Sequence, residues 1–272
     1  LSPKAIEAAL SPRTKAVMVV HYAGYACDMP AILEIARARQ LGVIEDAAHA
    51  VGASLAGKAL GAWGDAGCFS FFGNKNLTTA EGGMLVTDNP EIAEKARVLR
   101  SHGMTTLTWD RYKGHASTYD VVAQGYNYRM DELRSALGRE QLKRIPSGNA
   151  RRAELSALYR ELLGREVPAL SLPFQEQRGR SSYHILPALL PPGTDKRAFM
   201  ERLKQQGIQT SWHYPPVHRF SIYQAAYASR PNPLPITEAV AAREVTLPLY
   251  PTMTDEQVGW VVQAVKEALA GL

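Results

Sequence analysis

One lysine of this 272-residue chain stands out because of its neighbours. Lys75 lies in the stretch CFSFFGNKNLTTAEGGM, residues 68–84, among aromatic residues, small residues and glycines. The next carboxylate along the chain is that of Glu81. Such a lysine either reaches water from the tip of a turn or supplies an amine to a buried site. In the second alternative, burial disfavours the ammonium form and gives an amine that can attack a carbonyl group.

An acid and an imidazole precede this lysine. Asp46 follows Val43 and Ile44, which we expect in a buried parallel strand, and His49 comes three residues later. Open α/β sheets bind ligands at the carboxyl ends of their strands, so we expect Asp46, His49 and Lys75 at one sheet edge. This set suits pyridoxal phosphate, which needs a lysine amine and a carboxylate against its pyridine nitrogen. The plainer alternatives are a helix cap for Asp46 and a packed core position for His49.

The elements that must position these residues alternate between strand and helix. Short β-branched or aromatic runs predict strands at 15–20, 43–44, 66–72 and 83–87. Helical spacing of apolar residues predicts helices at 2–10, 29–42 and 89–103. The strand–helix–strand order predicts an α/β domain with a mostly parallel sheet and helices on both faces. The segment 104–130 shows no clear period, and we expect a long irregular loop of functional importance.

The second half of the chain predicts a smaller α+β domain. Two amphipathic helices at 130–145 and 151–164 flank IPSGNA, residues 145–150, which we expect to interrupt them. We therefore place a large domain at residues 1–148 and a small C-terminal domain at 149–272. In the small domain we further expect, in chain order, a strand in 181–192, a helix in 195–207, a strand in 208–217 and a capped helix in 254–269.

Composition narrows the class of protein. The apolar fraction of 46% and the charged fraction of 21% are ordinary for a globular protein. The formal net charge of +5 is spread along the chain without a basic block, which argues against nucleic acid. No apolar run is long enough for a membrane span, so we expect no membrane partner. Two cysteines, Cys27 and Cys68, are too few for a disulfide framework or a metal site and favour a cytoplasmic location.

Three ordered motifs carry a resemblance to a known family. IEDAAHAVGA, FSFFGNKNLTTAEGGMLVTD and GYNYRMDE together resemble the DegT/StrS-type nucleotide-sugar aminotransferases, a branch of the fold-type-I pyridoxal-phosphate enzymes. The resemblance covers essentially the whole chain, and the lysine motif is highly specific. It implies the fold-type-I large domain followed by the smaller C-terminal domain.

The resemblance also implies a role for each candidate residue. Lys75 matches the lysine that forms the Schiff base and carries the proton, and Asp46 matches the partner of the pyridine nitrogen. His49 stands where relatives place His or Gln against the cofactor ring. Ser70 matches the serine that binds the cofactor phosphate, with a plain strand position as its alternative. Asn127 resembles an asparagine that reaches the phosphate in the neighbouring subunit, which implies a homodimer with shared active sites; an ordinary turn is its alternative.

The implied reaction moves an amino group from an amino acid, L-glutamate in particular, to a keto-sugar attached to a nucleotide, for cell-surface polysaccharide biosynthesis. Relatives that dehydrate sugars carry histidine in place of the lysine, so Lys75 favours amine transfer. His184 and His213 lie in segments that resemble those near the family's substrate site, and His218 follows YPPV; a structural role is the alternative for each, and none has an assigned catalytic role.

Two alternatives stay open: another fold-type-I enzyme, such as a desulfurase or aldolase, and a truncated, catalytically silent module that dimerises or binds nucleotide sugar. The second arises because the chain opens inside an expected helix. We expect an N-terminal portion with a phosphate-binding turn in full-length members, and weak or absent cofactor binding without it.

Overall fold

The computed structural model describes residues 1–105, 118–228 and 234–271. These residues form two compact units. The first comprises Leu1–Ser147 with Arg178–Ser182, and the second comprises Gly148–Gln177 with Tyr183–Leu272. The first unit thus includes a short segment that comes from the second half of the chain.

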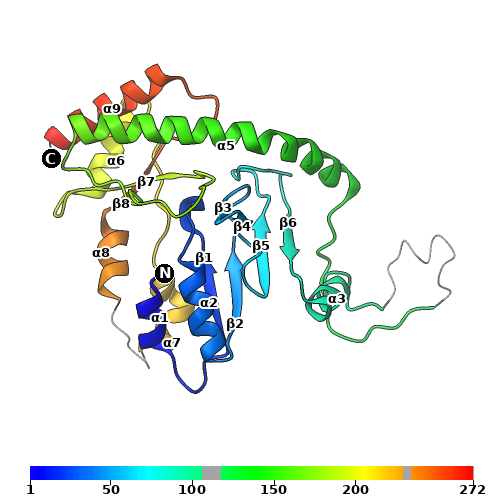
Figure 1. Cartoon of the computed structure of the whole chain (residues 1–272). Helices are drawn as coiled ribbons and strands as arrows, with labels where there is room; N and C mark the ends of the chain where they lie inside the picture. Colours follow the sequence, from blue (N-terminus) through cyan, green and yellow to red (C-terminus); the bar gives the residue numbers. More distant parts are fainter. Residues whose placement is uncertain (106–117, 229–233, 272) are drawn as a thin grey trace. The chain divides into compact units, whose positions relative to one another are not determined.

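A four-stranded sheet organises the first unit (Figure 1). Its strands in hydrogen-bonded order are β1 (Ala16–Val20), β2 (Gly42–Asp46), β5 (Ala66–Ser70) and β6 (Gly83–Val86). The first three are parallel, and β6 is antiparallel to β5. The sequence predicted these four strands, and the structure confirms them and the mostly parallel α/β class.

Two helices, α1 (Pro3–Ala9) and α2 (Met29–Ala38), pack on one face of this sheet. α2 begins after Asp28, whose carboxylate accepts a backbone hydrogen bond from the first turn. The core between helices and sheet contains Ile6, Val17, Val19, Met29, Ile32, Ala36 and Val43. Because successive strand residues point to opposite faces, Met18 and Val20 of β1 lie on the other face, where both are exposed.

The first unit contains three smaller elements and a further helix. The small elements are a 3-10 turn at Tyr22–Gly24, β3 (Ser54–Leu55) and β4 (Lys58–Ala59). The helix α3 (Pro90–Leu99) begins after Asn89, whose side-chain oxygen accepts hydrogen bonds from two backbone N–H groups of its first turn.

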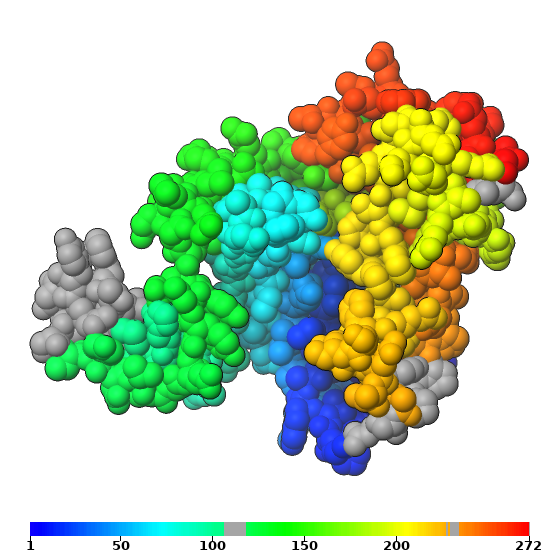
Figure 2. Space-filling model, turned by 180° about the vertical axis from the view of Figure 1, so that it is seen from behind, coloured from blue at the N-terminus to red at the C-terminus, as the bar shows by residue number. Residues whose placement is uncertain are grey.

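The irregular segment predicted at 104–130 is described at 104–105 and 118–130, and its remainder lies outside the described residues. Its described part hydrogen-bonds with the end of α3, where Tyr126 donates to Leu99 and Tyr128 donates to Arg100 through their backbone N–H groups. Figure 2 shows these green residues around the blue-green helix.

One prediction is wrong: IPSGNA does not interrupt a pair of helices. Residues Glu132–Glu166 form a single helix, α5, which contains Pro146. Proline removes one helical hydrogen bond, but Ser147 donates its hydroxyl to the Arg144 carbonyl at 3.1 Å. Pro146 itself is exposed, and the preceding Ile145 is buried in a cluster with Val51, Phe71 and Leu77. This packing outweighs the local preference for a break.

The second unit consists of a two-stranded antiparallel sheet and helices. Its elements beyond α5 are β7 (Leu186–Leu189), α6 (Lys196–Gln205), a 3-10 turn at Val217–Arg219, α7 (Ser221–Ala228), α8 (Pro235–Arg243), β8 (Glu244–Leu247) and α9 (Asp255–Ala270). A capping box between Thr254 and Gln257 begins α9, as its sequence predicts.

The prediction of a strand at 208–217 is wrong. The expected strand at 208–217 makes only an isolated bridge, between Ser211 and Thr246, and β8 takes its place. The proline pair at 215–216 cannot donate ladder hydrogen bonds, whereas EVTL at 244–247 can. No helix in the described ranges is long and apolar enough to cross a membrane.

Candidate active site

The carboxyl ends of β2 and β5 bring three candidate side chains to one sheet edge. Asp46, the last residue of β2, is paired in register with Cys68 of β5, so their side chains share one face. Ser70 lies two residues further along β5 on that face. Asp46 is half-buried, and its Oδ1 accepts a hydrogen bond from the Ala48 backbone N–H at 3.0 Å. This bond opens the turn that leads to His49.

The Lys75 loop connects β5 to β6 and is closed at its base by backbone hydrogen bonds. Phe71 donates to Gly82, and Thr79 donates to Phe71. Nearer the tip, the Lys75 N–H donates to the Phe72 carbonyl at 3.0 Å, and its side chain is half-buried. The loop therefore presents the amine from a tight turn next to the strand ends.

Burial lowers the pKa of the Lys75 ammonium, and the negative charge of Asp46 works in the opposite direction. The two groups therefore lie within electrostatic reach of each other. Because burial prevails, the equilibrium moves toward the neutral amine, which is the nucleophilic form. The same carboxylate, together with burial, raises the pKa of the neighbouring Cys68 thiol.

His49 is buried, and its ring is held by the backbone of the β1–α2 connection. Its Nδ1 accepts a hydrogen bond from the Ala23 N–H at 3.1 Å, which leaves Nε2 to carry the proton. Its ring is tilted against that of Tyr22, with 6.1 Å between the ring centroids. The orientation of the imidazole is thus fixed before any ligand binds.

The remaining two candidates differ in their surroundings. Ser70 is half-buried, and its Oγ accepts a hydrogen bond from the Phe72 N–H at 3.4 Å. Asn127 is exposed and forms a backbone bridge with Ser101 beside α3. The sheet edge does not bring Asn127 together with the other four residues. Its expected role concerns the neighbouring subunit.

Sequence reasoning missed a buried acid–imidazole pair directly behind this edge. His21, immediately after β1, and Glu45, immediately before Asp46, are both fully buried, with 2.8 Å between Nε2 and Oε2. Burial works to lower the pKa of His21, but hydrogen bonds and charges from Cys27 and Glu45 raise it to about 9. A signal was present in the sequence, since His21 immediately follows its predicted strand, near the edge at which Asp46 ends the next strand.

Three histidines noted in the sequence lie in the second unit. His184 is buried, and its carbonyl accepts a hydrogen bond from Arg152. The Nδ1 of His213 lies 2.7 Å from the Thr246 hydroxyl, and His218 pairs with Glu238. They have no assigned role here.

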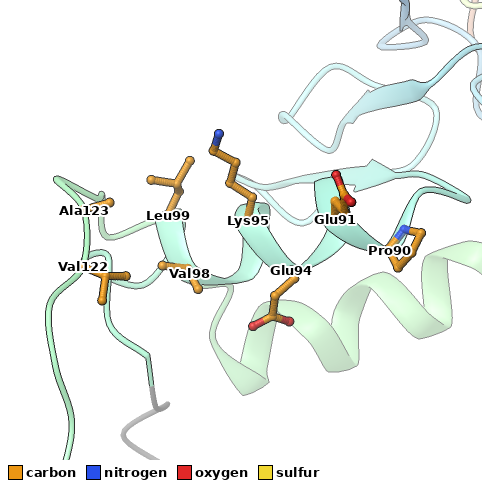
Figure 3. A pocket seen from close by; sticks show the side chains of 8 residues that line it. All are labelled: Pro90, Glu91, Glu94, Lys95, Val98, Leu99, Val122 and Ala123. Atoms are coloured by element: carbon orange, nitrogen blue, oxygen red, sulfur yellow. The ribbon is translucent and has the colours of Figure 1, made fainter.

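An apolar groove of the first unit lies elsewhere. Figure 3 shows that it runs along α3, with Val122 and Ala123 facing the C-terminal end of the helix. None of the candidate residues lines it. Within the described ranges, no cluster of His, Cys, Asp and Glu could hold a metal ion.

Known proteins match both this sequence and this fold. The sequence model of the DegT/DnrJ/EryC1/StrS aminotransferase family matches residues 1–266. The chain belongs to this family. The DegT/DnrJ/EryC1/StrS enzymes are pyridoxal-phosphate-dependent sugar aminotransferases of fold type I. The predictions of the family, the fold-type-I architecture, the enzyme class and the cofactor are thereby confirmed.

Individual relatives give the same result. The chain is 40% identical over 276 residues to the spore coat polysaccharide biosynthesis protein SpsC of Bacillus subtilis, covering 100% of this chain and 71% of SpsC. The structure of Helicobacter pylori PseC, an aminotransferase involved in the biosynthesis of pseudoaminic acid, matches with a TM-score of 0.92 at 29% identity, over 100% of this chain and 71% of PseC. The structure of DesI, solved in the presence of its TDP-sugar product, matches with a TM-score of 0.86 at 30% identity, over 100% and 67% of the two chains.

The residues at the sheet edge fit pyridoxal phosphate. Lys75 has an amine displaced toward its neutral form, as covalent attachment to an aldehyde requires. Among the described residues, Asp46 accepts one hydrogen bond, through Oδ1, so that Oδ2 can accept a hydrogen bond from a protonated pyridine nitrogen. The donor set of Lys75, Asp46, His49 and Ser70 thus matches the chemistry of the aldehyde, the ring nitrogen, the ring and the phosphate.

Proposed function

We propose that this protein transfers an amino group from an amino acid, L-glutamate in particular, to the keto group of a nucleotide-linked sugar. The observation that carries the proposal is a half-buried Lys75, with a pKa lowered by burial, within electrostatic reach of Asp46 at the carboxyl edge of the sheet. Family membership supports the sugar as acceptor. The TDP-sugar product of DesI supports a nucleotide on that sugar, and the role of SpsC supports use in cell-surface polysaccharide synthesis.

Each residue takes one task in this proposal. Lys75 holds the cofactor covalently and moves a proton to and from the substrate carbon, which requires its neutral form. Asp46 would accept a hydrogen bond from the protonated pyridine nitrogen and so keep it protonated, and pyridoxal phosphate, when bound, supplies the electron sink that stabilises negative charge on the substrate. His49 supports the ring from its fixed orientation, and the Ser70 hydroxyl donates to the phosphate.

A substrate panel tests the reaction. The protein is incubated with L-glutamate and a series of nucleotide-linked keto-sugars, and release of 2-oxoglutarate is measured. We expect release with at least one sugar and its loss in Lys75→Ala, whereas Lys58→Ala, a change at an exposed lysine of β4, leaves the rate unchanged. Release that persists in Lys75→Ala contradicts the assignment. No release with any sugar, together with binding of nucleotide sugar, favours the silent binding module.

We further propose a cytoplasmic homodimer in which Asn127 completes the partner's site. Mixing separately inactive Lys75→Ala and Asn127→Ala proteins tests this arrangement. If Asn127 acts across the dimer, a mixed dimer contains one site with an intact lysine and an intact asparagine, so part of the activity returns on mixing. If Asn127 acts within its own subunit, both sites of the mixed dimer are defective, and no activity returns.

A further inference from the structure

A short segment from the second half of the chain is built into the first unit beside the candidate site. We call Arg178–Ser182 the clamp segment. Its Arg180 exchanges two backbone hydrogen bonds with Ser54, of 2.8 and 2.9 Å, and Arg178 forms an ion pair with Asp28 at 2.8 Å. Residues 178 and 180 of the clamp segment therefore fix it to the rest of the first unit, independently of its last residue, Ser182.

The last residue, Ser182, is fully buried and bonds in three directions. Its hydroxyl donates to the His49 carbonyl at 2.5 Å, and its N–H donates to the Gly24 carbonyl at 3.3 Å. Its own carbonyl accepts a hydrogen bond from the Asn76 side-chain amide at 2.8 Å. One residue thus joins the turn that holds His49 to the residue that follows Lys75.

Gly24 shows how closely the clamp segment approaches. Its φ is +89°, and a Cβ placed there would lie 1.9 Å from the Ser182 hydroxyl oxygen and 2.9 Å from the His49 carbonyl oxygen. Only glycine fits this position, because any other side chain would displace Ser182 from His49. The backbone of three separate segments therefore meets at Ser182.

The Lys75 loop needs such a connection because its own hydrogen bonds lie mostly at its base. Residues 72–74 at the tip are exposed, and Lys75 itself is only half-buried. Fixing the tip of such a loop in one conformation costs conformational entropy. A hydrogen bond to a rigid neighbouring segment offsets part of this cost. Asn76 supplies a bond of this kind immediately beside the amine.

We infer that Asn76 and Ser182 are a positioning pair, which fixes the Lys75 loop against the His49 turn and so holds the amine beside Asp46. This inference rests on the proposed function for its significance and adds two residues to the site. Neither residue touches the reacting atoms in this role. Their contribution is to keep Lys75 partly out of water and at one place relative to the carboxylate.

The chain offers a matched control, since Asn74 and Asn76 flank Lys75 and only Asn76 donates to the clamp segment among the described residues. In cofactor-free protein, amines are labelled with acetic anhydride across a pH series, and the midpoint for Lys75 is compared with that for exposed Lys58. In Asn76→Ala we expect the midpoint of Lys75 to rise by about half a unit or more toward that of Lys58, since the amine becomes hydrated. In Asn74→Ala we expect no rise.

A double-mutant cycle tests whether Asn76 acts through the clamp segment. Ser182→Ala removes the hydroxyl bond to His49 but leaves the carbonyl that accepts from Asn76, so we expect a rise in the same direction. In Asn76→Ala/Ser182→Ala we expect less than the sum of the single effects, because the two hydrogen bonds lie in series in one connection between the Lys75 loop and the His49 turn. Ser182→Ala also provides the measurement should Asn76→Ala fail to fold.

In amino transfer we expect Asn76→Ala to lower kcat by about tenfold with little change in KM, because a misplaced amine slows the reaction more than it weakens binding. Equal Lys75 labelling midpoints in wild type, Asn76→Ala and Asn74→Ala overturn the inference, as do additive effects in the cycle. Absence of amino transfer in wild type, with the labelling shifts present, overturns the proposed function and leaves the positioning pair intact.

Discussion

Two consecutive carboxylates at the end of β2 have opposite surroundings. Glu45 and Asp46 point to opposite faces of the sheet because strand side chains alternate. Each has a basic partner: Glu45 is paired with His21, and Asp46 acts on Lys75. Glu45 is fully buried, whereas Asp46 is half-buried.

The hydrogen bonds of the two carboxylates differ as much as their burial. Glu45 accepts from the backbone N–H groups of Gly61, Trp63 and Gly64 at 2.6–2.7 Å and from His21 at 2.8 Å. Burial works to raise its pKa, but these bonds lower it. A carboxylate with this many donors has little capacity left for a ligand, so we assign the Glu45 pair to stability and the Asp46 pair to chemistry.

The largest effect is expected on catalytic activity, from a substitution of Asp46, the carboxylate that we assign to chemistry. In Asp46→Asn we expect kcat to fall by about 10³-fold, because a neutral amide cannot keep the pyridine nitrogen protonated. The unfolding free energy should change by less than about 1 kcal/mol, since Asn can still accept from the Ala48 N–H through Oδ1. Steady-state kinetics and urea unfolding measure both quantities. A large loss of stability in Asp46→Asn would contradict the division.

The neighbouring substitution should give the reverse result. Glu45→Gln places an NH2 group against backbone donors, because both oxygens of Glu45 accept hydrogen bonds. We expect the unfolding free energy to fall by about 3 kcal/mol, the usual cost of breaking a buried pair. Urea unfolding measures this loss, and Glu34→Gln, at a position outside the sheet, is its control. Unchanged stability would show that the buried pair is not structural.

The His21 partner makes part of this stability dependent on pH. Its pKa rises from 6.5 to about 9 in the folded protein, so folded His21 binds its proton more tightly than unfolded His21. The pair therefore contributes fully below pH 6.5, and the contribution disappears as the pH rises through about 9. We expect the difference in unfolding free energy between wild type and His21→Gln to shrink by ~3 kcal/mol between pH 6 and pH 10. A difference that is constant over this range contradicts a charged His21.

The same comparison explains what the sequence could predict. Asp46, His49 and Lys75 belong to short motifs next to strands, so the sequence brings them to one edge of the sheet. His21 and Glu45 are separated by 24 positions, and Asn76 and Ser182 by 106, so nothing local indicates their contacts. The single helix α5 was missed for a related reason, since Ile145, beside the exposed Pro146, packs against residues 51, 71 and 77, which are far away in the sequence.

The smallest expected effects are on the pKa values of two cysteine thiols. Cys27 lies beside the His21–Glu45 pair and Cys68 lies beside Asp46, so each thiol reports on one of the two carboxylates. Burial works to raise the pKa of the Cys27 thiol, but a hydrogen bond with His21 and the positive charge of His21 lower it. The pKa of Cys68 is raised by burial and by Asp46. Alkylation by iodoacetamide across a pH series, followed by peptide mass spectrometry, measures both thiols in one sample.

If the two pairs are electrostatically separate, each substitution should affect one thiol. Asp46→Asn removes a negative charge beside Cys68, so its labelling midpoint should fall by less than about one unit, while that of Cys27 stays constant. His21→Gln removes the group that favours the Cys27 thiolate, so the midpoint of Cys27 should rise while that of Cys68 stays constant. A response of both thiols to either substitution would mean that charge at one face of β2 is felt at the other. The assignment of Glu45 to stability alone would then fail, because its charge would also act on Lys75.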